Sequence, residues 1–198
     1  MNKKNLLIGS ALVLAALLVV GGTMAWFTAA AEPVTNTFTA GTVNIKLHDV
    51  QMDNGEELLF PENGIGNVNP GDEYEKIVYV ENTGTKAVYV RVKLTPAWTK
   101  GESSLPLQVG GVNMATFPIV DDRWVPDGDW YYFKDPLAPG HSTGYLINKV
   151  EFAGVAMTND YQGATFTLTV EAEAVQASHE AYKDEWGTDI TFLTPYIP

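Results

Sequence analysis

Two segments of the chain alternate apolar and polar residues with a period of two, and this pattern restricts both to β-strands. The apolar positions of the first are Val88, Val90, Val92 and Leu94, and those of the second are Ala164, Phe166, Leu168, Val170 and Ala172. Such strands bury one face in a core and leave the other in water. With the many Gly, Pro and Asn turns between short segments, they predict an all-β, two-sheet, jelly-roll-like sandwich.

The remaining elements are short. Further strands are predicted at residues 35–49, 73–81, 105–109, 116–125, 130–133 and 143–152, with turns at 51–55 and 82–85 and loops at 62–71 and 135–140. The turn at 82–85 joins two strands directly, so 73–81 and 86–95 are predicted to pair as a hairpin. Two prolines exclude a strand from 135–140. One helix is expected at 178–186, with Ser178 as its N-cap.

The N-terminus carries a targeting signal. Lys3 and Lys4 precede an apolar stretch from Leu6 to Val20, and small residues follow it. This order is typical of a secretory signal peptide, so residues 1–25 are read as that peptide and residues 26–198 as one secreted domain. Cleavage after Ala25 and cleavage after Ala31 both fit. The alternative is a retained membrane anchor, because the apolar run extended to Phe27 is long enough to span a bilayer.

Composition narrows the classes of function. The 198 residues include no cysteine, which excludes disulfides and thiolate chemistry. The formal net charge is −12. Removal of residues 1–25, which contain two lysines and no acidic residue, changes it from −12 to −14. Such a surface repels nucleic acid, so no nucleic-acid partner is expected.

Catalytic motifs are lacking in the sequence. The three histidines, His48, His141 and His179, lie far apart, and no His-Glu-x-x-His, Gly-x-Ser-x-Gly or P-loop pattern occurs. A zinc peptidase assembled from these histidines is the enzymatic alternative. The sequence favours a protein that is not an enzyme and needs no cofactor.

An acidic loop is the best candidate for a metal. Its carboxylates are Asp121, Asp122, Asp127 and Asp129. Calcium prefers several oxygen ligands, which closely spaced aspartates supply, but the spacing differs from that of an EF-hand. Solvated turn aspartates explain the same pattern.

Aromatic residues crowd the middle of the chain. Trp124, Trp130 and Tyr132 would suit a platform for matrix or cell-wall glycan. Large rings also fill sandwich cores and subunit interfaces, so the pattern fits either role.

The segment that follows the signal is apolar or small from Trp26 to Phe38. An extended segment of this kind can add as a strand to the sheet edge of a neighbouring subunit. Repeated head-to-tail, that contact builds open filaments. The alternative is that the segment folds as the first strand of its own sheet.

Four stretches of the sequence resemble the TasA/camelysin family of exported bacterial surface and biofilm-matrix proteins. They are GGTMAWFTAAAEPVTNTFTAGTVNIKL (21–47), NPGDEYEKIVYVENTGTKAVYVRVKL (69–94), DPLAPGHSTGYLINKVEF (135–152) and ATFTLTVEAEAVQ (164–176). They are distributed over residues 21–176, which is most of the chain, in the same order as in the family.

The resemblance implies a jelly-roll domain, processed near Ala25 by a dedicated signal peptidase. It also implies extracellular fibres of identical copies, in which one subunit's N-terminal strand completes the next subunit's sheet. That strand would lie within residues 26–47, and its contact residues would be Trp26, Phe27, Phe38, Val43 and Ile45. The family's metallopeptidase label finds no zinc motif here.

Overall fold

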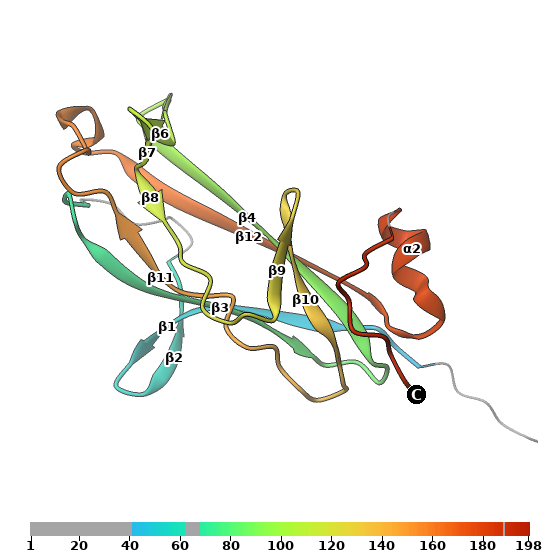
Figure 1. Ribbon diagram of the computed structural model, residues 1–198. Helices are drawn as coiled ribbons and strands as arrows, with labels where there is room; N and C mark the ends of the chain where they lie inside the picture. Colours follow the sequence, from blue (N-terminus) through green and yellow to red (C-terminus); the bar gives the residue numbers. More distant parts are fainter. Residues whose placement is uncertain (1–40, 62–67, 188) are drawn as a thin grey trace, which may run out of the picture. The chain divides into compact units, whose positions relative to one another are not determined.

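Two antiparallel β-sheets face each other in the computed structural model, which describes residues 41–61, 68–187 and 189–198 (Figure 1). The first sheet has the strand order β2 (Glu56–Leu59), β1 (Ile45–Asp53), β3 (Glu73–Asn82), β11 (Ile147–Phe152) and β8 (Ala115–Thr116). The second has the order β12 (Thr165–Gln176), β4 (Val88–Lys100), β10 (Trp130–Leu137) and β9 (Trp124–Asp127), with β5 (Ser103–Leu105) also paired to β4. A separate two-stranded ribbon joins β6 (Gln108–Val109) and β7 (Val112–Asn113).

The main core lies between the two sheets. Val78 and Val80 of the first sheet meet Val88, Val90 and Val92 of the second, and all five are fully buried. The period of two therefore placed the apolar face of β4 correctly. The all-β prediction, with one short helix near the end of the chain, is confirmed.

One buried ring in this core has an unusual environment. Trp98, at the far end of β4, packs edge-on against Phe152 and Tyr161 and is 1% exposed. Its indole N–H has no hydrogen-bond acceptor among the described residues. The ring therefore stabilises the core by its apolar contacts, against the cost of one unpaired donor.

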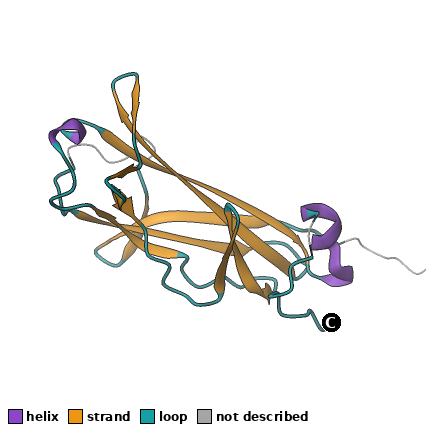
Figure 2. Cartoon of the chain, turned by 45° about the horizontal axis from the view of Figure 1, so that its top comes forward, coloured by secondary structure: helices purple, strands orange, loops and turns teal. Residues whose placement is uncertain are grey.

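A second, smaller core covers the outer face of the second sheet. Three short helical elements are present in the described chain, η1 (Asn159–Tyr161), η2 (Ser178–Glu180) and α2 (Ala181–Trp186), and the last two begin the C-terminal segment (Figure 2). This core comprises Tyr89, Tyr132, Val175, Ala177, Tyr182, Ile190 and Leu193. The hydroxyl of Tyr89 donates to the carbonyl oxygen of Thr194 at 2.7 Å, which ties the C-terminal segment to β4.

Within the described residues, no helix has the length and apolar character needed to cross a membrane.

The predicted hairpin of residues 73–81 and 86–95 is wrong. β3 and β4 belong to different sheets, and the link between them crosses from one sheet to the other. The buried side chain of Asn82 holds this crossover, because its amide nitrogen donates to the carbonyl oxygens of Lys86 and Leu137. Alternation shows which face of a strand is buried, but it does not identify the strand's partner.

Several other boundaries also differ from the prediction. β1 continues to Asp53, so the turn is only Asn54 and Gly55, both with positive φ. β10 continues through Pro136 to Leu137, because its register against β4 shifts after Phe133 and leaves the proline outside regular pairing. The strand expected at 105–109 is interrupted after Leu105, most of 116–125 is loop, and β11 begins only at Ile147.

Ser178 is not the N-cap of the helix. The chain passes through positive φ at His179 and Glu180, so α2 begins one short turn later, with Glu180 at the capping position. The Ser178 hydroxyl instead accepts a hydrogen bond from the side-chain amide of Gln176.

Candidate assembly site

One long side of the sandwich is bordered by two strand edges that have no further partner among the described residues. β12 pairs with β4 along its whole length, and its other edge is unpaired. β1 pairs with β2 from Val50 onward, and the carbonyl oxygen of Asp49 also accepts from Phe60 N, which leaves residues 45–48 unpaired on that side. β1 and β12 lie against each other across the two sheets. We call this side of the molecule the open side.

Core-facing residues on the open side are incompletely covered. Val170, Ala172 and Ala174 of β12 pack against the main core but are only half-buried. Ile45 and Leu47 of β1 also pack against the main core and are also half-buried. The central strand β4 buries its core-facing valines completely. Among the described residues, the main core is therefore less completely covered along the open side than beneath β4.

A pocket of about 350 Å³ opens beside this exposed part of the core. One wall is Leu59, Phe60 and Pro61, and the opposite wall is residues 167–170 of β12. Asp49 and Lys76 also line it. The pocket is large enough for an apolar side chain, and its β12 wall offers an unpaired strand edge.

A buried ion pair lies in this pocket. Lys76 is 2% exposed, and its ammonium donates to Asp49 Oδ1 at 2.5 Å while lying 3.7 Å from the ring centroid of Phe60. Burial lowers the pKa of Lys76, and the bond to Asp49 opposes that shift only in part.

The sequence analysis did not single out Lys76. Because it is two residues before Val78 on a strand, it shares the core-facing side with Val78 and Val80. That spacing was the signal that could have identified it. A lysine on the inner face of a strand needs an acidic partner.

The residues predicted for strand donation divide into two groups. Trp26, Phe27 and Phe38 lie outside the described residues, as does the signal segment. Val43 is 42% exposed, and Ile45 begins β1 and pairs with Asn82 of its own chain. The backbone of Thr42 also exchanges bonds with Thr85 of the crossover. In the described structure, Ile45 therefore belongs to a sheet of its own chain, and Thr42 is bonded to the crossover of its own chain.

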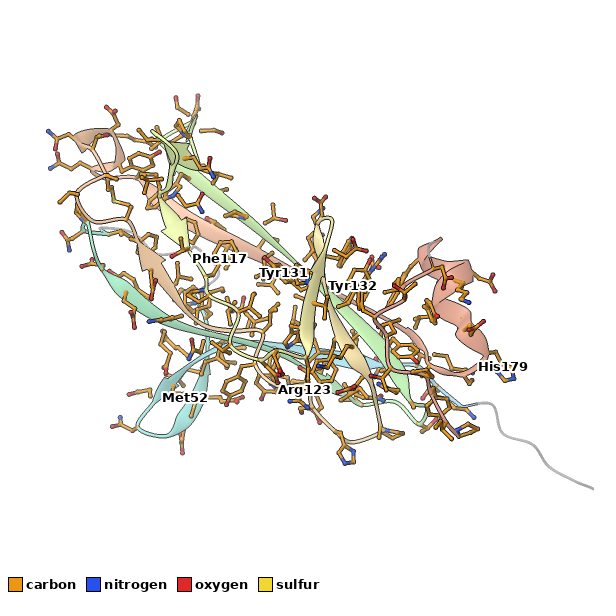
Figure 3. All side chains as sticks on the ribbon, viewed as in Figure 1. Met52, Phe117, Arg123, Tyr131, Tyr132 and His179 are labelled. Atoms are coloured by element: carbon orange, nitrogen blue, oxygen red, sulfur yellow. The ribbon has the colours of Figure 1, made fainter. Side chains whose placement is uncertain are left out.

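The three rings proposed for glycan binding do not form an exposed platform. Trp124 is 3% exposed in the main core, and its indole N–H donates to the carbonyl oxygen of Gly144. Tyr132 is buried in the second core, beneath the C-terminal segment (Figure 3). Trp130 lies 4.3 Å from the guanidinium of Arg91, which is also 4.7 Å from the ring of Trp186. Tyr132 and Trp130 therefore help to attach the C-terminal segment to the second sheet, whereas Trp124 belongs to the main core.

The four aspartates of the acidic loop are spread along β9: Asp121 and Asp122 precede the strand, Asp127 is its last residue and Asp129 follows it. Asp121 accepts two-pronged hydrogen bonds from Arg123, and these bonds hold the pKa of Asp121 below its usual value. Asp122 and Asp127 are exposed, and Asp129 lies 3.3 Å from the ammonium of Lys93. None of these side chains joins a group of three potential metal ligands in the described part of the chain.

The three histidines lie on separate elements. His48 stacks on Tyr79 and lies 3.0 Å from a carboxylate oxygen of Glu81. His141 is in the loop before β11, and His179 lies beside α2 (Figure 3). No group of three or more His, Asp or Glu side chains suited to a metal ion occurs in residues 41–61, 68–187 and 189–198.

Comparison with known proteins identifies the family. No curated protein matches the chain. A family model described as camelysin metallo-endopeptidase matches residues 2–101, which include the apolar N-terminal stretch and the strands β1 to β4. Because the match covers half of the sequence, it confirms the resemblance read from the sequence motifs. The chain therefore belongs to the camelysin family.

Proposed function

We propose that this protein is an exported structural subunit of extracellular fibres, in which the N-terminal segment of one copy completes the open side of the next. The observation that supports this most is the half-buried state of Val170, Ala172 and Ala174 beside an unpaired strand edge. A strand added there would cover the core and pair with the free backbone groups of β12.

The chemistry of the donated segment suits this role. Residues 26–40 contain one charged side chain, Glu32, and include Trp26, Phe27 and Phe38. Their rings are of the right kind to fill the pocket between Phe60 and β12. Because donor and acceptor are different surfaces, each copy would use both, and the contact would repeat without closing.

The donor side is tested by deleting residues 26–38 from the secreted chain that begins at Trp26. We expect the shortened protein to stay folded and monomeric, because β1 to β12 and both cores are retained. The measurements are negative-stain electron microscopy and sedimentation, with mass spectrometry to locate the N-terminus of the natural secreted form. Filaments from the shortened chain would rule out donation by this segment.

The acceptor side is tested by Ala172→Glu. At this half-buried edge position the carboxylate can reach water in the monomer, but a donated strand would bury the charge without a partner. We expect filament formation to be lost and, because Ala172 packs against the main core, the free energy of unfolding of the monomer to fall by about 1–2 kcal/mol while the monomer stays folded. Ala97→Glu, at an exposed alanine of β4, is the matched control and should assemble normally. Equal assembly by both variants would contradict acceptance at β12.

A metal-dependent peptidase, as in the family's description, is the second candidate. We place it second because the described residues offer no cluster of metal ligands and hold the three histidines on separate elements.

A further inference from the structure

One end of the sandwich carries a long stretch of chain without charged side chains. Residues 103–120 include no Asp, Glu, Lys or Arg, in a chain whose net charge is −12. Three exposed large apolar side chains lie in or next to the β6–β7 ribbon of this stretch, with exposures of 36–45%: Leu107, Val109 and Val112. Ile119 and Val120 lie further along the sandwich, where they bond to Ile147 and Leu146, at and just before the start of β11. We call residues 103–117 the uncharged head.

The head contains its own pocket. Leu107 and Phe117 line a hollow of about 380 Å³ together with Pro96 of β4 and Phe166 of β12. The ribbon of β6 and β7 beside it pairs with neither sheet in the described structure. Phe117 lies near β8, on the side of the molecule away from α2 (Figure 3).

A second uncharged surface lies at the opposite end. Residues 190–198 also carry no charged side chain, and Ile197 is 85% exposed. This segment is tied to Tyr89 at the start of β4, whereas the head adjoins the end of the same strand through β5. The 13 residues of β4 separate the two surfaces by roughly 40 Å. Figures 1 and 2 both place the β6–β7 ribbon and the end of the chain at opposite ends of β4 and β12.

We infer that these two surfaces bind each other in successive copies, with the residues around Ile197 of one copy in the head pocket of the next. Strongly acidic copies repel one another, and contact between segments without charged side chains requires no charged side chain to be desolvated. The exposed apolar groups on both surfaces would be removed from water in the contact, which stabilises it. The contact joins unlike surfaces, as fibre growth requires. This inference rests on the proposed fibre and adds to it a second contact along the fibre axis.

Disulfide trapping tests the contact cleanly, because the natural chain has no cysteine. Two variants of the chain from Trp26, Leu107→Cys and Ile197→Cys, are mixed, assembled and oxidised. We expect a disulfide-linked dimer that contains one of each variant. Leu58→Cys replaces Leu107→Cys in the control mixture, because the two leucines are 43% and 45% exposed. The control should give at least tenfold less dimer.

The outcomes separate this inference from the proposed function. Fibres that form normally without the 107–197 dimer, or with equal dimer in the control, overturn the end contact and leave strand donation standing. The same cysteine variants without residues 26–38 test the end contact separately from strand donation. A 107–197 dimer from these shortened chains would support the end contact, whether or not fibres depend on strand donation. Loss of fibres in a Leu107→Lys variant, with recovery when Ile197→Glu is supplied in the same chain, would support it further.

Discussion

We expect Asn82→Ala to lower the free energy of unfolding by about 3 kcal/mol. The side chain is fully buried at the crossover between the two sheets. Its amide nitrogen donates to the carbonyl oxygens of Lys86 and Leu137 at 2.8 and 2.9 Å, and its oxygen accepts from Gly84 N at 3.0 Å. Alanine removes all three bonds and leaves two carbonyl groups without this donor in a site with little water.

Chemical denaturation of the monomer, kept below its assembly concentration, measures this loss. Asn148→Ala is the matched control, since Asn148 is exposed on β11, and we expect it to change the free energy of unfolding by no more than about 0.5 kcal/mol. A loss below about 1 kcal/mol for Asn82→Ala would show that the crossover is held by other contacts, such as the backbone bonds from Thr83 and Gly84 to Asn44.

The second large effect is a difference in stability between the two substitutions that each remove one partner of the buried ion pair. Asp49→Ala leaves the ammonium of Lys76 buried without its carboxylate, and we expect a loss of about 2 kcal/mol. The loss is moderated because Asp49 is 32% exposed and water reaches the pocket. Lys76→Met keeps a similar volume and removes the charge, so we expect a stability within about 1 kcal/mol of the natural protein. Equal losses for both variants would contradict this account.

The pH dependence of stability provides an independent test of whether the ammonium of Lys76 is buried. Burial lowers the pKa of Lys76 below its usual 10.5, so the folded chain binds fewer protons there than the unfolded chain between the two values. Stability due to this group therefore rises with pH through that window. We expect the natural protein to gain stability relative to Lys76→Met as the pH rises towards the usual lysine pKa of 10.5.

Above pH 10 a second group acts with the opposite sign. Burial, aided by the hydrogen bond to Glu57, raises the pKa of Tyr79 to about 12. The unfolded chain then loses the phenol proton first, so stability falls as pH rises from 10 towards 12. Both Lys76→Met and the natural protein should show this decline. A curve for Lys76→Met that parallels the natural one below pH 10 would show that Lys76 is not desolvated.

The sequence predicted the faces of strands better than their neighbours. Val88, Val90 and Val92 were expected on one side of a strand, and they lie in the main core. The pairing of β3 with β1 and β11, and of β4 with β10 and β12, depends on contacts distant in the chain. Nothing in the local turn at 82–85 distinguishes a hairpin from a crossover, because the buried contact of Asn82 with Leu137 involves residues far apart in the sequence.

The candidate site was predictable only in part. An apolar N-terminal segment suggested donation, but the proposed acceptor, the unpaired edge of β12, depends on which strands lie at the sheet edges. The alternating pattern of β12 is the same whether Ala172 and Ala174 are covered or half-buried. The aromatic residues near Trp124 likewise gave no sign of their burial, since rings serve cores and surfaces equally well.

The C-terminal segment has a consequence for how this strand-rich chain avoids disorderly aggregation. Without it, the second sheet would present Tyr89, Tyr132 and Val175 on its outer face while burying valines on the inner one. A sheet that is apolar on both faces can stack on its own copies as dry zippers, which is the packing of amyloid. By covering that face, residues 177–187 and 189–198 leave the edges and ends of the domain as its uncovered surfaces, and in the proposed fibre these are the surfaces through which copies would add.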